Sequence, residues 1–369
     1  MAESYLAWDL SVLEHRRVMV MRRQIARNRR ESENPLDLED SEFLYLYRVT
    51  KDMFSELVGA LRPSLQKQQP YGLSVESQLQ TALRFYASGC YQLPVGLQWG
   101  CSMSQKSVSR VVHAVTEAIN EKLLRKYIKF PMTPEGRRAA KAKFRNAPQP
   151  FPDAIGAIDC THIKILAPKL HEEAYVSGHH EGHSLNVQVV CDPDLLILNI
   201  NAKWPGARHD AHIWANSPVR STMKRHFDNG DRRTWLLGDD GYPLEPWLMT
   251  PIKNQHLGTP ERRYTDAHGS ARNIIERCFG VLKSVFRCLS HQRQLMYEPY
   301  TAGLIVNACA VLHNMRIKYR LLEPYVTTST EIIVDSYNDD GLEDTGRVTG
   351  TGRAIAERIQ RRLINTTFT

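Results

Sequence analysis

The chain has 369 residues, 42% of them hydrophobic and 24% charged, which is the composition of a soluble globular protein long enough for two domains. No apolar run approaches the ~18 residues of a membrane-spanning helix, and Asp9 and Glu14 interrupt the segment that a signal peptide would need. The seven cysteines are dispersed, which argues against a disulfide framework, so we expect an intracellular protein without membrane contact. The formal net charge of +8 favours a polyanionic partner.

Residues 1–45 are predicted to form a basic helical arm that ends in an acidic linker. The arm contains seven arginines, Arg16, Arg17, Arg22, Arg23, Arg27, Arg29 and Arg30. Such a run is typical of a nuclear import signal or of an arm that binds phosphates. It is equally typical of a solvated helix face, and both interpretations stay open at this stage.

Residues 46–130 are predicted to form an all-helical domain with a helix-turn-helix. One helix should begin after Ser74, a plausible N-cap, because apolar residues recur at helical spacing from Val75 to Tyr86. A short segment, LPVGLQWG, then leads through a turn into the helix SQKSVSRVVHAVTEAI. The polar face of that helix offers Gln105, Lys106, Ser109 and Arg110, which we expect to contact DNA. Any helical bundle contains such helix pairs, so the alternative is a purely structural unit.

Residues 131–152 are predicted to be a basic connector, because the stretch from Lys122 to Arg145 has nine basic residues against the single acid Glu135. In the next domain, 153–322, we expect strands in AIGAIDCTHIKIL, SLNVQVVCD and LLILNINAKW, the last apolar on both faces as a central strand would be. We then expect a helix from Asp210 to His226, a strand ending in a turn in TWLLGDDGYP, and a short strand in MTPIKN. Two helices should follow, Ala271 to Phe286 and Glu298 to Tyr319.

This order of elements predicts an α/β fold, a five-stranded mixed sheet with flanking helices, preceded by the all-α domain. The tail, 323–369, is polar and acidic and ends in a basic segment. We expect it to be partly disordered, with a helix near its end.

The helix from Ala271 to Phe286 has charged residues in an unusual place. Arg272, Glu276 and Lys283 fall within about 40° of one another on a helical wheel, at the edge of the apolar face. The position suggests a functional site. The simpler interpretation is an ordinary pair between Arg272 and Glu276, four residues apart on one helix.

Several carboxylates are expected at strand ends. Asp159 lies inside the first strand, where an unpaired charge is costly, Asp210 is expected to end the third strand, and Asp239 ends the fourth. If the first and fourth strands are neighbours, Asp159 and Asp239 converge and a helix across them could add Glu276. Such a cluster favours Mg²⁺ or Mn²⁺ and supports two-metal phosphodiester chemistry. Taken singly, each acid could be a cap or half of a salt bridge.

Histidines provide weaker candidates. His179, His180 and His183 suggest zinc but lie on a predicted loop, and His209 and His212 flank Asp210, where they could contact substrate. The sequence contains no Ser/His/Asp hydrolase elbow, P-loop or dinucleotide-binding glycine motif.

Together these segments resemble a known family. AIDCTHI, LLGDDGYP and RNIIERCFGVLK are similar to the three acidic segments of the Asp-Asp-Glu transposases, and the spacing of Arg272, Glu276 and Lys283 resembles a signature of one branch of that superfamily. With SLNVQVVCD and WPGARHDAHIW, the chain resembles the PIF/Harbinger transposases and the nucleases derived from them, over about Tyr71 to Tyr319.

The resemblance implies a ribonuclease H-like fold with Asp159, Asp239 and Glu276 as the catalytic and metal-binding triad. It implies Asp210 as a further metal ligand, His209 as a supporting residue, and Arg272 and Lys283 as residues that orient Glu276 or bind phosphate. The GDxGY pattern assigns Asp239, not Asp240, to the triad.

We therefore expect a DNA endonuclease that uses a pair of divalent cations, Mg²⁺ or Mn²⁺. We expect it to act in the nucleus, with the cytoplasm as a second location. The resemblance also implies a separate Myb/SANT-like partner protein, and a homodimer is compatible with the sequence. The alternative is a catalytically silent, domesticated DNA- or chromatin-binding protein.

Overall fold

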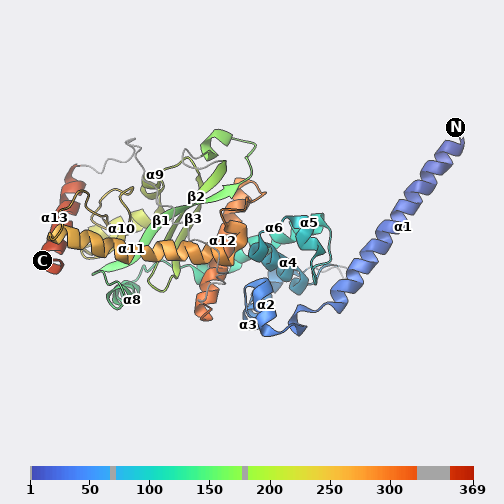
Figure 1. Ribbon diagram of the computed structural model, residues 1–369, viewed down its shortest axis with the longest axis horizontal. Coiled ribbons are helices and arrows are strands. Elements are labelled where there is room, and N and C mark those ends of the chain that lie inside the picture. Colours follow the sequence, from blue (N-terminus) through green and yellow to red (C-terminus); the bar gives the residue numbers. More distant parts are fainter. Residues whose placement is uncertain (1, 67–71, 177–181, 322–349) are drawn as a thin grey trace. The chain divides into compact units, whose positions relative to one another are not determined.

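The computed structural model describes residues 2–66, 72–176, 182–321 and 350–369 (Figure 1). The chain divides into two compact units, Met1–Ile119 and Asn120–Thr369. Within the described ranges, none of the helices combines the length and the apolar character needed to span a lipid bilayer.

The first unit is helical throughout its described residues, as the sequence predicts. Its helices are α1 (Ala2–Ser32), the 3₁₀ turn η1 (Pro35–Asp37), α2 (Asp40–Tyr47), α3 (Lys51–Leu65), α4 (Val75–Ser88), α5 (Gln92–Leu97) and most of α6 (Gln105–Lys122). Ser74 caps α4 as predicted, since its hydroxyl accepts a hydrogen bond from the Ser77 amide at 3.1 Å. The predicted basic arm is the helix α1.

A tight turn joins α5 to α6. The Met103 amide donates to the Gly96 carbonyl at 2.9 Å. A Cβ on Gly96 would overlap the carbonyl oxygen of Met103. Glycine is therefore required at this position for the chain to fold back. From the other side, the carboxylate of Glu33, just after α1, accepts a hydrogen bond from the Gly100 amide at 2.6 Å.

The second unit contains the predicted five-stranded mixed sheet. Its strands are β1 (Ala154–Ile165), β2 (His183–Cys191), β3 (Ile197–Pro205), β4 (Trp235–Leu237) and β5 (Leu248–Met249), in the order β3-β2-β1-β4-β5. The strands β1, β2 and β3 pair antiparallel, whereas β4 runs parallel to both β1 and β5. The expectation that the first and fourth strands are neighbours is confirmed.

Two details of the predicted sheet were wrong. The strand β3 lies at the edge of the sheet, and its apolar residues are covered because α12 packs against it. It ends at Pro205, so Asp210 does not end a strand but begins a helix. The last two strands are short, and for the fifth strand this was expected. Gly238 and the turn after it follow β4, and Pro251, which cannot donate to a ladder, follows β5 closely.

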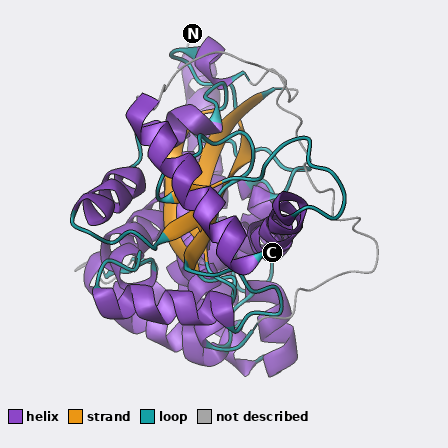
Figure 2. Ribbon diagram, turned by 90° about the vertical axis from the view of Figure 1, so that its left-hand side faces the viewer, coloured by secondary structure: helices purple, strands orange, loops and turns teal. Residues whose placement is uncertain are grey.

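Helices flank the sheet, as Figure 2 shows. The helix α7 (Leu124–Tyr127) lies just before the predicted basic connector, and α8 (Pro134–Arg145) lies within it. The sequence analysis did not predict α8, which packs against β1 and contributes Ala140 to a core cluster with Ile155, Trp214 and Leu236. The short 3₁₀ turns η2 (Glu172–Tyr175) and η3 (Arg287–Leu289) complete the connections.

The single helix predicted from Asp210 to His226 is two helices. These are α9 (Asp210–Ala215) and α10 (Pro218–Asp228). Pro218 has no amide hydrogen and starts the second helix, while the hydroxyl of Ser217 caps it by accepting from the Arg220 amide at 3.1 Å. The Ser–Pro pair therefore interrupts a pattern that is helical on both sides.

Two long helices pack against the sheet. The helix α11 (Pro260–Val285) begins well before the predicted Ala271, behind the N-cap Thr259, and packs against β1, β2 and β4 (Figure 1). The helix α12 (Pro299–Lys318) confirms the predicted helix and packs on β3. Residues 323–349 of the predicted tail lie outside the described residues. The last part of the tail forms α13 (Gly350–Thr367), which contacts α11.

Candidate metal centre

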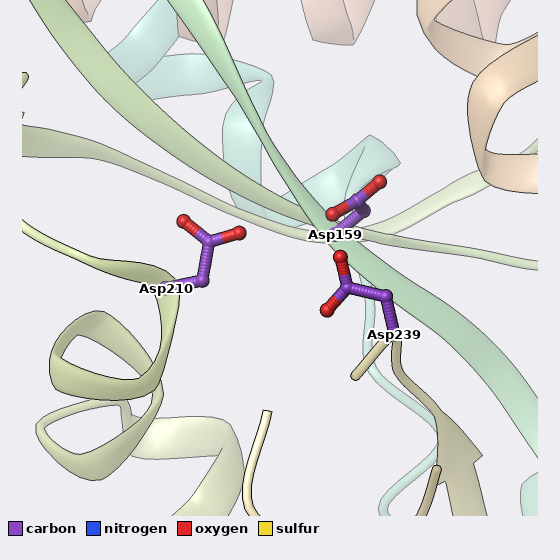
Figure 3. Close-up of side chains that lie close together, drawn as sticks. All are labelled: Asp159, Asp210 and Asp239. Carbon is purple, nitrogen blue, oxygen red and sulfur yellow. The ribbon is translucent and has the colours of Figure 1, made fainter. Parts of the chain in front are cut away.

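Three aspartates from three elements meet where the ladder between β1 and β4 ends. Asp159, Asp210 and Asp239 each offer a carboxylate oxygen, and these oxygens all lie within 4.8 Å of one another (Figure 3). We call this group the acidic cluster. Asp159 comes from β1, Asp210 is the first residue of α9, and Asp239 follows β4.

The sheet explains why Asp159 and Asp239 converge. The ladder between β1 and β4 ends at the pair Ala157–Leu237, two residues before Asp159 and Asp239 respectively. Because the two strands are parallel, their next residues leave the ladder at the same end of the sheet. The side chain of Asp159 is 14% exposed and that of Asp239 is 32% exposed, so one carboxylate is largely withdrawn from water and the other faces it.

Hydrogen bonds fix the orientation of each carboxylate. Asp159 Oδ1 accepts from the Cys160 amide at 2.9 Å, and Asp239 Oδ1 accepts from the Gly241 amide at 3.1 Å. Asp210 Oδ1 accepts from Asn186 Nδ2, on β2, at 3.0 Å. Each aspartate is therefore held by a neighbouring group before any ligand arrives.

Arg272 connects the acidic cluster to Glu276. Its Nη2 lies 2.6 Å from Asp159 Oδ2 and 3.6 Å from Asp239 Oδ2, and its Nη1 lies 3.1 Å from Glu276 Oε1. The guanidinium thus stands between the carboxylate on α11 and two of the aspartates. The Nε of Arg272 is buried and has no hydrogen-bond partner among the described residues.

The charges of the cluster perturb one another. Burial raises the pKa of Asp159 well above its ordinary value; Arg272 opposes this effect, while the carboxylates of Asp239 and Asp210 reinforce it. Burial alone would lower the pKa of Arg272, but Asp159, Asp239 and Glu276 raise it instead. Crowded carboxylates of this kind favour binding of cations, and here the resident cation is Arg272.

Cys160 is not an anionic member of the site. Its Sγ lies 3.4 Å from Tyr242 Oη, and burial followed by the Asp210 carboxylate raises the pKa of the thiol well above its ordinary value. The thiol stays neutral, so the ligands available are oxygens.

The other predicted residues occupy varied places. Glu276 is 33% exposed and is not one of the three mutually close carboxylates, but it shares Arg272 with two of them. Lys283 lies further along α11, with its Nζ 3.1 Å from His291 Nε2. His209 is exposed and immediately precedes α9. Of two consecutive acids, Asp239 joins the cluster, whereas Asp240 points to Lys253, 2.9 Å away.

The residues expected to contact DNA lie in the first unit, on α6. Gln105, Lys106 and Arg110 are exposed and Ser109 is half-buried. The opposite face of the helix is buried, through Val108, Val111, Val112, Val115 and Ile119. The amphipathic pattern read from the sequence is therefore confirmed.

The histidine candidates do not form a second cluster in the described part of the chain. His179 and His180 lie outside the described residues, and His183 Nε2 is 2.9 Å from Glu172 Oε1. The ring of His212 packs edge-on against Trp204, with 5.3 Å between ring centroids.

Two contributors were missed by sequence reasoning. Asn186 was read only as part of an alternating strand, although a buried amide on such a strand signals a specific hydrogen bond. The pairing of Arg272 with Asp159 spans 113 positions in the chain, and no local pattern indicates it.

Comparisons with known proteins cover these same segments. Residues 158–314 match the family described as DDE superfamily endonuclease. The Bos taurus protein named "Putative nuclease HARBI1" is 36% identical over 290 residues, which cover 77% of this chain and 79% of the relative. The Homo sapiens protein of that name is 35% identical over 290 residues, with the same coverage. An Arabidopsis thaliana protein named "Antagonist of like heterochromatin protein 1" is 28% identical over 299 residues, 76% of this chain and 74% of the relative. No solved structure matches the chain.

Proposed function

The chain belongs to the Harbinger transposase-derived nuclease family, and on that premise we propose that it is a metal-dependent endonuclease that hydrolyses phosphodiester bonds of DNA. The observation that supports the proposal most directly is the acidic cluster, three carboxylates from three elements within 4.8 Å, beside Glu276 on α11. In this proposal Asp159, Asp239 and Glu276 form the catalytic triad, and Asp210 is a further ligand.

The donor set suits a hard divalent cation. All three groups of the acidic cluster offer carboxylate oxygens, which Mg²⁺ and Mn²⁺ prefer, and the thiol of Cys160, next to Asp159 in the chain, stays protonated. Burial, reinforced by the carboxylates of Asp239 and Asp210, raises the pKa of Asp159 even with Arg272 in place, so the site favours a further positive charge. When bound, a pair of such ions would supply an acidified water and a stabilised leaving oxygen, the chemistry that a two-metal Asp-Asp-Glu mechanism requires.

The side chains have separable roles. Asp159, Asp210 and Asp239 hold the cations, with Asn186 keeping Asp210 in place. Arg272 fixes the carboxylate of Glu276 through its Nη1. With a cation in the cluster, Nη2 of Arg272 can donate to a phosphate oxygen. The ammonium of Lys283, about two turns beyond Glu276 on α11, can do the same. His209, exposed beside Asp210, supports substrate contact.

The strand order β3-β2-β1-β4-β5, with an antiparallel first half and a parallel second half, supports the ribonuclease H-like arrangement that the sequence resemblance implies. The helix-turn-helix of α5 and α6 is proposed to contact DNA through Gln105, Lys106, Ser109 and Arg110. The proposal places the protein in the nucleus, with the cytoplasm as a second location, and includes a Myb/SANT-like partner and a homodimer. The net charge of +8 supports a polyanionic ligand such as DNA.

One relative favours a second function. The name of the Arabidopsis protein refers to a heterochromatin protein, which supports a DNA- or chromatin-binding role without cleavage. The retained acidic cluster favours the nuclease, because a binding module gains nothing from crowded carboxylates near phosphates.

A cleavage assay separates the two functions. Supercoiled plasmid is incubated with the protein in Mg²⁺, in Mn²⁺ or in EDTA, and nicked and linear products are measured. We expect cleavage only with the cations, loss of cleavage in Asp159→Asn and Asp239→Asn, and its retention in the control Asp240→Asn, whose carboxylate pairs with Lys253 outside the cluster. Binding of DNA without cleavage by any of the proteins would favour the binding module.

A further inference from the structure

A polar pocket opens in the unit that contains the acidic cluster, between the end of β1 and the segment after η3. Its volume is about 390 Å³, and it is lined by Lys164, Gly182, His183, His291, Gln292, Arg293 and Gln294. None of the side chains described at its lining is a carboxylate. Two of them, Lys164 and Arg293, carry positive charge.

Backbone pairing gives this pocket a fixed wall. The Leu295 amide donates to the Lys164 carbonyl at 2.9 Å, and the Leu166 amide donates to the Leu295 carbonyl at 2.9 Å. The side chain of Gln294 adds a hydrogen bond to the Ile165 carbonyl at 2.7 Å. The segment that supplies His291 and Arg293 is therefore tied to the same strand that supplies Lys164 and Asp159.

The pocket is also connected to α11. Lys283 Nζ lies 3.1 Å from His291 Nε2, so a third cation adjoins the lining. His183, also in the lining, has its Nε2 2.9 Å from Glu172 Oε1. Lys164, His291 and Arg293, with Lys283 behind His291, thus form a basic site that we call the distal pocket.

The distance to the acidic cluster suits one strand of nucleic acid. Lys283 follows Glu276 by seven residues on α11, about 10 Å at the helical rise. Lys164 follows Asp159 by five residues on β1, about 16 Å along the strand. Phosphates on one strand of a duplex advance by about 3.4 Å along its axis, so this span corresponds to about three to five nucleotides.

We propose that the distal pocket binds a backbone phosphate of the DNA, three to five nucleotides from the bond that the acidic cluster cuts. The cut itself rests on the proposed function; the binding does not. A backbone phosphate is favoured over a free phosphate ion because Gly182, Gln292, Arg293 and Gln294 are all exposed. An open rim lets a chain enter and leave, whereas a free anion is held best by an enclosing pocket.

Equilibrium binding without metal tests this assignment. A fluorescent 30-base-pair duplex is titrated in EDTA with wild type, with Lys164→Gln/Arg293→Gln, and with the control Lys224→Gln/Arg225→Gln, which removes the same charge from exposed positions on α10. The pocket variant should bind about tenfold more weakly. The slope of log affinity against log salt should become shallower by about 0.9 for each phosphate that the variant no longer neutralises. The control should stay within about twofold of wild type.

Other outcomes overturn the proposal. If the affinities of the pocket variant and the control fall equally, the pocket contributes only its share of net charge. If calorimetry shows that inorganic phosphate binds wild type but not the pocket variant, while DNA affinity is unchanged, the ligand is a free anion. Arg293→Gln alone, at an exposed position, gives the same comparison should the double variant misfold. Cleavage in Mn²⁺ is measured separately. If wild type binds DNA through the distal pocket but cuts no DNA, the proposed nuclease function is refuted, while the proposed phosphate site stands.

Discussion

Arg272 occupies the position where a cation is most needed, and replacing it should both weaken the fold and strengthen metal binding. Its guanidinium contacts Asp159, Asp239 and Glu276, at 2.6, 3.6 and 3.1 Å. The change Arg272→Met keeps much of the side-chain length but removes the charge. Asp159, Asp239 and Glu276 then lose the cation that they share.

The cost can be bounded from the exposure of the partners. Removing one member of a fully buried ion pair costs about 3–5 kcal/mol. Arg272 and Asp159 are 15% and 14% exposed, but Asp239 and Glu276 are about a third exposed, at 32% and 33%, so water compensates part of the loss. We expect the free energy of unfolding in EDTA to fall by about 2–3 kcal/mol, a decrease in Tm of roughly 5–10 °C.

Metal binding should change in the opposite direction. In wild type a cation must displace the guanidinium, whose Nε is already without a hydrogen-bond partner among the described residues. In Arg272→Met that competition is gone, so Mn²⁺ measured by calorimetry should bind about tenfold more tightly, a difference of about 1.4 kcal/mol. The gain in Tm on adding Mn²⁺ should also be larger than in wild type, because a ligand that binds only the folded state stabilises it.

Two variants control this experiment. Arg277→Met changes an exposed arginine on the same helix and should alter neither Tm nor Mn²⁺ affinity appreciably. Arg272→Lys keeps the charge but loses the planar fork that reaches several carboxylates, so it should be intermediate. Equal Mn²⁺ affinity in wild type and Arg272→Met, or unchanged stability in EDTA, would refute the role of Arg272 as a counter-ion that metal displaces.

Because the pKa of Asp159 is raised in the folded protein, its protonation stabilises the fold at low pH, and this stabilisation is lost as pH rises from about 4 through the folded pKa. In EDTA, Asp159→Asn should therefore flatten the plot of Tm against pH. At pH 8 the Tm of this variant should match or exceed that of wild type. A Cβ on Gly303 would overlap the Ala202 carbonyl oxygen, so Gly303→Ala should cost about 1–3 kcal/mol in urea unfolding, whereas Gly280→Ala, with nothing within 4 Å, should gain up to about 1 kcal/mol. Glu245 is 1% exposed and lies 2.6 Å from Arg220, so Glu245→Gln should cost about 1–3 kcal/mol in the same assay.

The convergence of Asp159 and Asp239 was predictable because it follows from local rules. Each acid directly follows a run of buried strand residues, and adjacent parallel strands bring such positions together. The edge position of Arg272 and Glu276 on α11 was likewise contained in the 3.6-residue period of the helix. The sequence pattern therefore located the site and most of its charged groups.

What the pattern could not provide depended on contacts distant in the chain. Arg272 pairs with Asp159 as well as with Glu276. The pair with Asp159 depends on how α11 packs across β1 and on the rotamer of Arg272, which no periodicity records. The edge position of β3 escaped detection because α12 covers it, so its composition resembles that of a central strand. The segment from His291 to Leu295 pairs with β1 through isolated hydrogen bonds, too short a stretch for an alternating pattern to show.

Occupancy of the acidic cluster by a divalent cation underlies every catalytic step proposed here, and anomalous diffraction from crystals grown with Mn²⁺ measures it directly. We predict an anomalous peak coordinated by Asp159 and Asp239, with the Arg272 guanidinium withdrawn from Asp159, and no such peak in Asp159→Asn crystals. A wild-type structure in saturating Mn²⁺ with no peak at the cluster, and with Arg272 still bridging Asp159 and Glu276, would contradict the metal centre and the nuclease mechanism with it.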